Sequence, residues 1–194
     1  MTDGTFVGGD WNNTVAGFTY GTRLDASSAG LANGGWVTTW SETIWPNTGG
    51  LDDPEIYAQI YDANGNPVGS NILINTTQLG AQVKPKVVGI DNGNFVISWV
   101  SADQDGDGWG IYSQTFDSSG IPVGTETLIN TTTTGDQFEH NSISLDNGGY
   151  AMAWAEEVDN GGGSFTISIK MQQYTSAGVP DGVETTIKTE VPPK

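Results

Sequence analysis

The stretch NGNFVISW, residues 92–99, decides the fold because two close copies of it occur elsewhere in the chain. NGGWVTTW covers residues 33–40, and NGGYAMAW covers residues 147–154. Each copy begins with an Asn-Gly pair, which supplies the positive φ of tight hairpin turns. It continues with residues that favour strands, and it ends in Trp. The repeat therefore predicts three equivalent β-hairpins, each with its Trp in the core.

Further recurring elements follow each copy. They are IYAQIYD, IYSQTFD and IKMQQYT at residues 56–62, 111–117 and 169–175; GNPVG, GIPVG and GVPDG from Gly65, Gly120 and Gly178; and ILINTT, TLINTT and TTIKTE from Ile72, Thr127 and Thr185. We expect Gln59, Gln114 and Gln172, which recur in the first element, to have a structural hydrogen-bonding role. No window has helical periodicity, so each unit reads as about four short strands. The units span about residues 33–91, 92–146 and 147–190 of a single domain covering residues 1–194.

The strand that follows the INTT element differs between the units, and this difference indicates how the strands are grouped into sheets. After the INTT element, the first two units continue into a further strand, at residues 82–91 and 137–146, whereas the third unit does not. A matching segment lies near the N-terminus, at residues 24–32. We therefore predict an all-β fold of three propeller-like antiparallel sheets, in which the N-terminal strand completes the last unit and closes a ring. A β-sandwich built from the same strands is the alternative.

The composition excludes several classes of function. The chain has 194 residues, of which 23 are acidic and 6 are basic, so its net charge is −17. Nucleic acids and anionic membrane surfaces bind basic surfaces, so neither is an expected partner. There is no cysteine, which excludes disulfides, thiol catalysis and cysteine-ligated zinc. An extracellular protein without disulfides needs another stabilising element, and Ca²⁺ is a common one.

The stretch DQDGDG, residues 103–108, is the sharpest candidate site. Asp103, Asp105 and Asp107, followed by a glycine, match the opening of an EF-hand calcium loop. The twelfth position is Gln114 instead of a bidentate Glu, and strands are expected to flank the loop, so it is not an EF-hand. Oxygen ligands without His or Cys nearby favour Ca²⁺ over transition metals. The alternative is a solvated Asp-Gly hairpin tip.

The loops after Trp40 and Trp154 are acidic as well, and in a threefold repeat the three loops lie on one face. The candidate metal ligands in these two loops are Glu42, Asp52, Asp53, Glu156 and Asp159, with Glu55 and Glu157 beside them. Trp109 follows the aspartates of the middle loop, and Trp45 lies in the first loop. Both are candidates for the wall of a ligand site, the alternative being that they pack over the hairpins.

Catalysis has little support in the sequence. His140 is the only histidine, and no nucleophile motif accompanies it, so we expect a strand residue on a polar face. Glu156 and Glu157 are adjacent, and adjacent strand residues face opposite ways, so they do not flank one glycosidic bond. We therefore expect no enzymatic activity.

These elements resemble repeats in very large bacterial surface proteins of the RTX adhesin type. The resemblance rests on the GG-aromatic-V-x-x-W, D-G-x-G-I-Y-x-Q-x-F-D, G-x-P-V-G-x-E and I-N-T-T elements and covers about residues 24–190. The acidic 20.4 kDa domain is similar to the calcium-dependent peptide-binding domain near the distal end of such adhesins.

The resemblance implies a non-enzymatic module at the bacterial cell surface, excised from a secreted chain and monomeric within it. Its partner is then the free C-terminus of a host or partner surface protein, with a bound Ca²⁺ helping to hold the terminal carboxylate. From their spacing in the sequence, we expect Asp103, Asp105 and Asp107 to be ligands of that ion. A calcium-dependent lectin that binds glycans and a calcium-stiffened structural spacer remain the alternatives.

Overall fold

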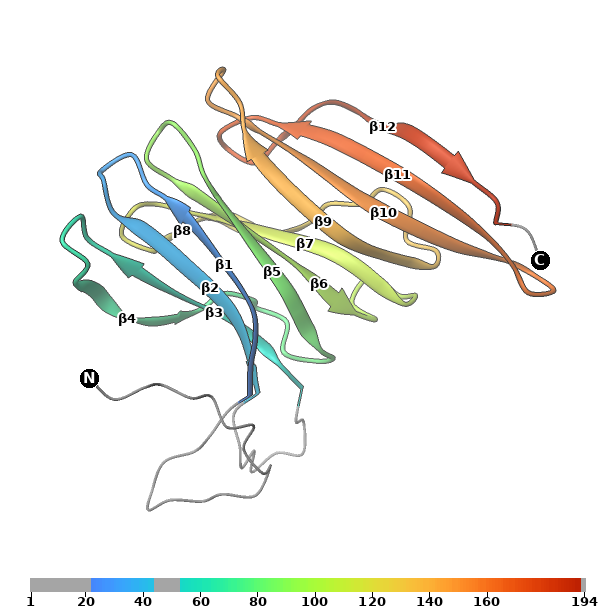
Figure 1. Cartoon of the computed structure of the whole chain (residues 1–194), viewed down its shortest axis with the longest axis horizontal. Helices are drawn as coiled ribbons and strands as arrows, with labels where there is room; N and C mark the ends of the chain where they lie inside the picture. Colours follow the sequence, from blue (N-terminus) through green and yellow to red (C-terminus); the bar gives the residue numbers. More distant parts are fainter. Residues whose placement is uncertain (1–21, 44–52, 193–194) are drawn as a thin grey trace, which may run out of the picture.

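The computed structural model describes residues 22–43 and 53–192 (Figure 1), which form twelve β-strands. The first sheet contains β1 (Thr22–Gly30), β2 (Trp36–Thr43), β3 (Glu55–Tyr61) and β4 (Pro67–Leu73); the second contains β5 (Gln82–Gly89), β6 (Phe95–Ala102), β7 (Trp109–Phe116) and β8 (Pro122–Leu128); the third contains β9 (Asp136–Ser144), β10 (Tyr150–Gly161), β11 (Ser164–Tyr174) and β12 (Pro180–Glu190). Neighbouring strands are antiparallel and follow chain order within each sheet. The prediction of an all-β fold with three four-stranded antiparallel sheets is confirmed. None of the described segments is a helix that would be long and apolar enough to cross a membrane.

The Asn-Gly turns form as predicted between the first two strands of every sheet. In the first sheet the N–H of Leu31 donates to the carbonyl of Gly35 at 2.8 Å, and Gly34 has a φ of 85°. Ile90 and Leu145 close the equivalent turns in the other two sheets. A left-handed φ suits glycine because it has no Cβ, which is why the repeat keeps Gly at this position.

The ring closure predicted for the N-terminal strand is wrong. Strand β1 pairs with β2 in the first sheet, with Gly30 opposite Trp36, and β9 fills the place in the third sheet that residues 24–32 were expected to take. The connection at residues 31–35 closes this hairpin locally, which costs far less chain entropy than pairing the two ends of the chain. Each sheet therefore begins one strand earlier than the sequence units at 33–91, 92–146 and 147–190.

The three sheets stack in series (Figure 1), and the inner strands β6 and β7 of the middle sheet are buried on both faces. Successive residues of a strand face opposite sides. Phe95, Ile97 and Trp99 of β6 therefore pack toward the first sheet, in one core cluster with Val37 and Ile56. A second cluster packs the opposite face against the third sheet; its members are Val88, Ile90, Val96, Ile111 and Ile129 with Tyr150, Met152, Trp154 and Tyr174.

The predicted roles of the recurring Trp and Gln residues are largely confirmed. Trp99 and Trp154 are buried in the two clusters, whereas Trp40 is half-buried on the outer face of the first sheet. Gln59 donates from its side chain to the carbonyls of Ile60 and Val68, at 2.8 and 3.2 Å. Gln114 and Gln172 make the same pair of bonds in their own sheets, so this residue links the third strand to the fourth.

A bulge distorts the first strand of every sheet at a charged residue. Asp25, Lys84 and Glu139 have φ values of 54°, 53° and 51°, and each lies where the pairing with the second strand shifts register. Bulges of this kind bend a strand and increase its twist. The Lys84 ammonium lies 2.6 Å from the Glu139 carboxylate, so the bulged strands of the second and third sheets are joined by an exposed ion pair.

Candidate functional site

The loop at residues 103–108 joins β6 to β7 as a compact turn. The N–H of Asp103 donates to the carbonyl of Gly108 at 2.6 Å, and the N–H of Gly106 donates to the carbonyl of Asp103 at 3.3 Å. Asp103 has a φ of 58°, and Gly106 and Gly108 also have positive φ values. The two glycines therefore permit a turn that residues with a Cβ rarely adopt.

Three carboxylates at this loop each accept a hydrogen bond from a donor of the protein. The Oδ2 atom of Asp105 accepts a bond from the Asn130 amide at 3.2 Å, and the Oδ2 atom of Asp107 accepts one from the N–H of Gly135 at 3.1 Å. Asp136 joins them, because its Oδ1 atom accepts the N–H of Trp109 at 3.2 Å. Sequence reasoning missed Asp136, since the equivalent residue of the first unit is alanine and the repeat gives no signal there.

Two glycines make room for these acids. A Cβ on Gly110 would lie 2.7 Å from the Oδ2 atom of Asp105, and a Cβ on Gly108 would collide with the Asp136 carboxylate. Asp105 and Asp136 therefore lie against the backbone on either side of Trp109. Trp109, which lies between these two glycines in the chain, is half-buried.

The carboxylates do not converge into a metal cage in this geometry. Within residues 22–43 and 53–192, no group of three or more His, Cys, Asp or Glu side chains is placed to hold a metal ion. Asp105 and Asp107 face amide donors, which a cation would have to displace, so the loop as folded does not fit a preformed three-carboxylate site. Calcium binding by Asp103, Asp105 and Asp107 stays a prediction.

The other candidate ligands are distributed over separate hairpins. Glu42 accepts a bond from the Trp40 indole N–H at 2.8 Å, and Glu55 accepts one from the Asn75 amide. Burial raises the pKa of Glu55 above its ordinary value. Asp53 is half-buried just before β3, while Asp52 and Trp45 lie outside the described residues.

In the third sheet the acidic residues lie in a strand instead of a loop, because β10 continues to Gly161. Glu156 is buried and faces the second sheet, and Glu157 occupies the opposite face of the strand. Asp159 accepts the N–H of Gly161 at 2.7 Å near the hairpin tip. Glu156 and Asp159 therefore have their own contacts within the third sheet, with Lys170 and Gly161.

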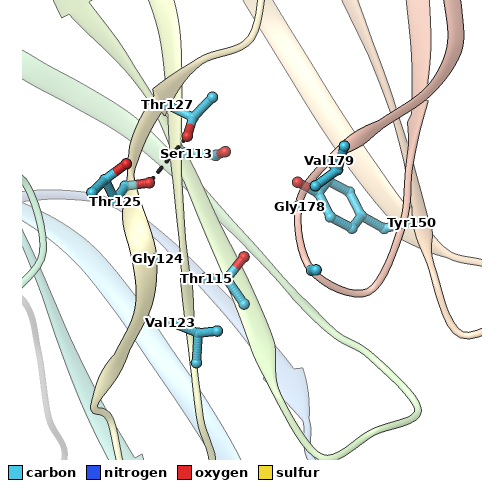
Figure 2. A pocket seen from close by; sticks show the side chains of 10 residues that line it. Ser113, Thr115, Val123, Gly124, Thr125, Thr127, Tyr150, Gly178 and Val179 are labelled. Carbon is cyan, nitrogen blue, oxygen red and sulfur yellow. Dashed lines mark hydrogen bonds between the residues drawn. The ribbon is translucent and has the colours of Figure 1, made fainter.

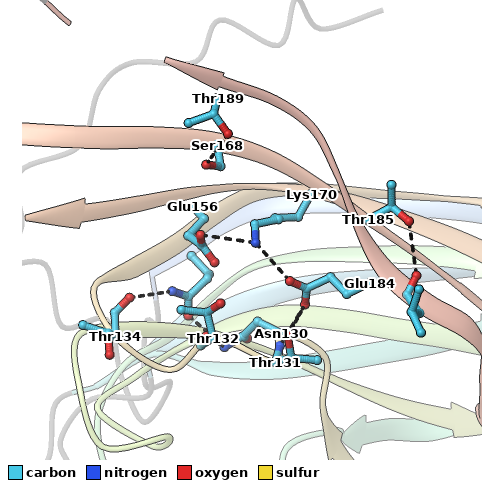
Figure 3. A network of polar contacts seen from close by, with 12 residues as sticks. Asn130, Thr131, Thr132, Thr134, Glu156, Ser168, Lys170, Glu184, Thr185 and Thr189 are labelled. Carbon is cyan, nitrogen blue, oxygen red and sulfur yellow. Dashed lines mark hydrogen bonds and ion pairs between the residues drawn. The ribbon is translucent and has the colours of Figure 1, made fainter. Parts of the chain in front are cut away.

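The INTT element forms the polar junction between sheets. Thr131 donates to the Oε2 atom of Glu184 in β12 from both its N–H, at 2.9 Å, and its hydroxyl, at 2.8 Å (Figure 3). Thr76 makes the same two bonds to Glu126 in β8, at 2.7 and 2.9 Å. The sequence repeat showed INTT but not this acceptor, because the equivalent residue of the first unit is Asn71.

The remaining oxygen of each junction glutamate has a different donor. Glu126 accepts from the Gln104 amide at 2.6 Å, whereas Glu184 lies 3.2 Å from the Lys170 ammonium. Lys170 also lies 3.6 Å from Glu156, so one largely buried lysine sits between two largely buried carboxylates (Figure 3). The positive charge of Lys170 compensates the buried negative charges of Glu156 and Glu184. Glu156 is thereby part of the polar junction between the second and third sheets.

A cleft of about 230 Å³ opens between the second and third sheets, beside β8 (Figure 2). Five hydroxyl groups line it, those of Ser113, Thr115, Thr125, Thr127 and Tyr150. The turn that carries Gly178 and Val179 forms the opposite wall (Figure 2). Burial raises the pKa of Tyr150 to about 12, so its hydroxyl keeps its proton at neutral pH.

The cleft has a cause in the sequence. At the junction of the first and second sheets, the turn at Gly120 packs directly against the side chains of Ile60 and Ile72. Thr115 and Thr127 occupy the equivalent positions at the next junction. Threonine is shorter than isoleucine, so the second junction is left with an open volume lined by hydroxyls.

His140 is a core residue, contrary to the expectation of a polar face. It is buried in β9, and neither ring nitrogen has a hydrogen-bond partner among the described residues. Burial lowers its pKa to about 4. The imidazole is therefore neutral at physiological pH and enclosed by the protein.

No protein-family model matches the chain, and no curated protein matches it. Among solved structures, an endo-arabinase from Bacteroides thetaiotaomicron VPI-5482 aligns with a TM-score of 0.47 and 14% identity, over 80% of this chain and 58% of that one. Morganella morganii TcdA4 aligns with a TM-score of 0.46 and 9% identity, over 84% of this chain and 8% of that one. The chain thus spans only part of the length of both proteins, and likenesses at this level carry no conclusion about its function.

Proposed function

We propose that this chain is a non-catalytic, calcium-dependent binding module of a bacterial surface adhesin, and that it recognises the free C-terminus of a partner surface protein. One observation supports this proposal more than any other. Asp105, Asp107 and Asp136 come from two segments and gather around Gly108 and Gly110, beside Trp109. Three carboxylates and two glycines without side chains therefore lie along this loop, although the carboxylates do not converge on one point as folded.

The chemistry of the partner follows from charge. A peptide carboxylate is repelled by a chain of net charge −17 unless a cation reverses the local potential. A bound Ca²⁺ would supply that reversal and an oxygen-binding position for the terminal carboxylate. Asp105 and Asp107 would hold the ion after exchanging their amide donors for it, and Trp109 would contact the peptide.

The placement of the only histidine supports a role without catalysis. A general base must reach its substrate and titrate near the working pH. His140 is enclosed in the core, and its pKa is lowered to about 4 by burial. The buried pair of Lys170 and Glu184 is likewise engaged in joining two sheets.

Peptide binding is tested by fluorescence anisotropy, with labelled peptides that end in a free carboxylate or in an amide. We expect binding of the free-carboxylate peptides in millimolar Ca²⁺, loss of binding in EDTA, and loss in Asp105→Asn. Asp146→Asn is the matched control, because it removes the same charge from an exposed turn outside the loop. Equal binding of amidated and free peptides would contradict the proposal.

Glycan binding is a second candidate, and the hydroxyl-lined cleft favours it. Five hydroxyls beside a small apolar wall suit the alternating polar and apolar surfaces of a sugar. Its test is a glycan array with the double variant Thr115→Ile and Thr127→Ile, which restores the isoleucines of the first junction and fills the cleft. A glycan that binds the natural chain and equally well this variant would exclude the cleft as its site.

A further inference from the structure

Both internal junctions join the same two kinds of sheet face. We call the face that packs toward the preceding sheet the leading face, and the face that packs toward the following sheet the trailing face. The leading faces of the second and third sheets are built around Ile97 and Met152. The trailing faces of the first and second sheets are built around Ile56 and Ile111. The junction is therefore one interaction used twice along the chain.

The third sheet keeps a trailing face on which no further described sheet packs. Its residue equivalent to Ile111 is Ile169, which is 37% exposed where Ile111 is fully buried. Phe165 on the same face is 39% exposed, and Ile143 in β9 is 60% exposed. Register places Ala155 opposite Ile169, so apolar residues continue across three strands. Contiguous exposed apolar side chains on a sheet face are a mark of interaction surfaces.

The first sheet keeps the complementary leading face. Trp36 stacks on Tyr61 with ring centroids 5.1 Å apart, in the same way as Phe95 on Phe116 at 5.5 Å and Tyr150 on Tyr174 at 4.9 Å. The latter two pairs are buried at internal junctions, whereas Trp36 and Tyr61 are half-buried. One chain therefore carries both halves of the interaction that joins its own sheets.

We propose that a second copy of this chain is the partner, and that two copies associate head to tail. The trailing face of each third sheet packs on the leading face of the other copy's first sheet. Such a contact is heterologous, because two different surfaces meet. It forms a closed ring when the rotation that relates successive copies brings the last copy back to the first. Two copies supply six sheets, within the range of four to eight that closed propellers contain. The proposal replaces the expectation of a monomer and does not depend on the proposed function.

The polar residues at the two ends agree with a junction of this kind. Asn71 in β4 replaces the carboxylate of Glu126 and Glu184, and Lys188 replaces the buried asparagine of INTT. In the contact between copies, Asn71 takes the position that Glu126 and Glu184 have at the internal junctions. Because Asn71 is neutral, this contact does not bury a carboxylate that needs threonine donors. Lys188 is already paired with Glu190 at 2.5 Å. The contact between copies thus relies on the apolar faces and is separable from the internal junctions.

The test is sedimentation velocity of the whole chain across a concentration series. We expect a species of twice the 20.4 kDa chain mass. Ile169→Arg on the trailing face and Thr38→Arg, at the leading-face position equivalent to Ile97, should each weaken association at least about tenfold. Leu79→Arg is the control, because it adds the same charge at an exposed site between sheets. Circular dichroism shows whether each variant keeps its sheets.

Mixing the two variants distinguishes head-to-tail packing from a symmetric contact. A pair made of one Ile169→Arg chain and one Thr38→Arg chain retains one intact junction, so the mixture should associate more tightly than either variant alone. A monomer at every concentration would overturn the proposal, as would a dimer insensitive to both substitutions. Open polymers, or a dimer broken by Ile169→Arg alone, would overturn the closed head-to-tail ring.

Discussion

Glu184 accepts two hydrogen bonds from Thr131 of the neighbouring sheet, one from the backbone N–H at 2.9 Å and one from the hydroxyl at 2.8 Å. Thr76 and Glu126 repeat this relationship one sheet earlier. The INTT element is therefore a connector: its threonine fixes the next sheet, and its asparagine fixes its own. Sheets joined in this way by apolar faces and a pair of hydrogen bonds to a carboxylate behave as repeated units whose stability depends on each junction.

Glu184→Ala should destabilise the chain by about 1–3 kcal/mol, because it leaves the Thr131 N–H and the Lys170 ammonium without this acceptor. Urea unfolding measures the change in the free energy of unfolding. Asn71→Ala, at the equivalent and exposed position of the first sheet, is the control and should change stability by no more than about 0.5 kcal/mol. Equal effects of the two substitutions would show that the junction bond contributes nothing.

Asn130→Ala should be costlier than a typical surface substitution, by about 2–3 kcal/mol, because four groups lose a partner. The Asn130 side chain accepts the N–H of Ile111 at 2.8 Å and donates to Thr132, Gln137 and Asp105. The measurement is again urea unfolding, with Thr133→Ala in the same segment as a reference. A cost below that of the reference would contradict the assignment of Asn130 as a buried connector.

His140 should make the stability depend on pH. Its pKa is lowered by burial from 6.5 to about 4, so the folded state favours the neutral ring. The resulting stability is fully present above about pH 6.5 and is lost as the pH falls from there toward 4, up to about 3 kcal/mol. Subtracting the stability profile of His140→Leu from that of the natural chain isolates this contribution. Parallel profiles between pH 6.5 and 4 would show that the histidine is accessible to protons in the folded state.

Thr127→Ile should stabilise the chain by up to about 1 kcal/mol, because it adds buried apolar surface to the cleft of the second junction. The equivalent residue of the first junction, Ile72, already packs against Gly120 in this way. Thermal unfolding compares Thr127→Ile with Thr133→Ile, which adds the same side chain at an exposed position outside the cleft. A loss of stability specific to Thr127→Ile would mean that the cleft is too narrow for the larger side chain.

The sequence predicted the strands well because their signals are local. Asn-Gly turns, alternating residues and the recurring Gln59, Gln114 and Gln172 each act within one hairpin, and the structure confirms them. Grouping the strands into sheets is not a local property. A period of four strands can begin at any strand of the repeat, so the sequence alone does not show that β1 pairs with β2.

The candidate site was less predictable, because its residues meet across segments that the repeat does not relate. Asp136 has alanine as its counterpart in the first unit, and Lys170 has tyrosine. The repeat therefore does not indicate a functional role at either position. Conversely, the acidic residues after Trp154 predict a loop, but strand β10 extends through Glu156 and makes it a buried partner of Lys170. Charge and spacing identify residue types, whereas burial and partners come from packing.

Thermal unfolding in EDTA and in millimolar Ca²⁺, with Asp105→Asn alongside, tests the calcium-dependent module most directly. A bound ion stabilises the folded state by mass action, by about 2.7 kcal/mol at a hundredfold excess over its dissociation constant. We predict a clear Ca²⁺-dependent rise in the melting temperature that Asp105→Asn reduces and the exposed Asp146→Asn does not. An unchanged melting temperature, or an equal rise in all three proteins, would contradict an ion site in the loop at residues 103–108.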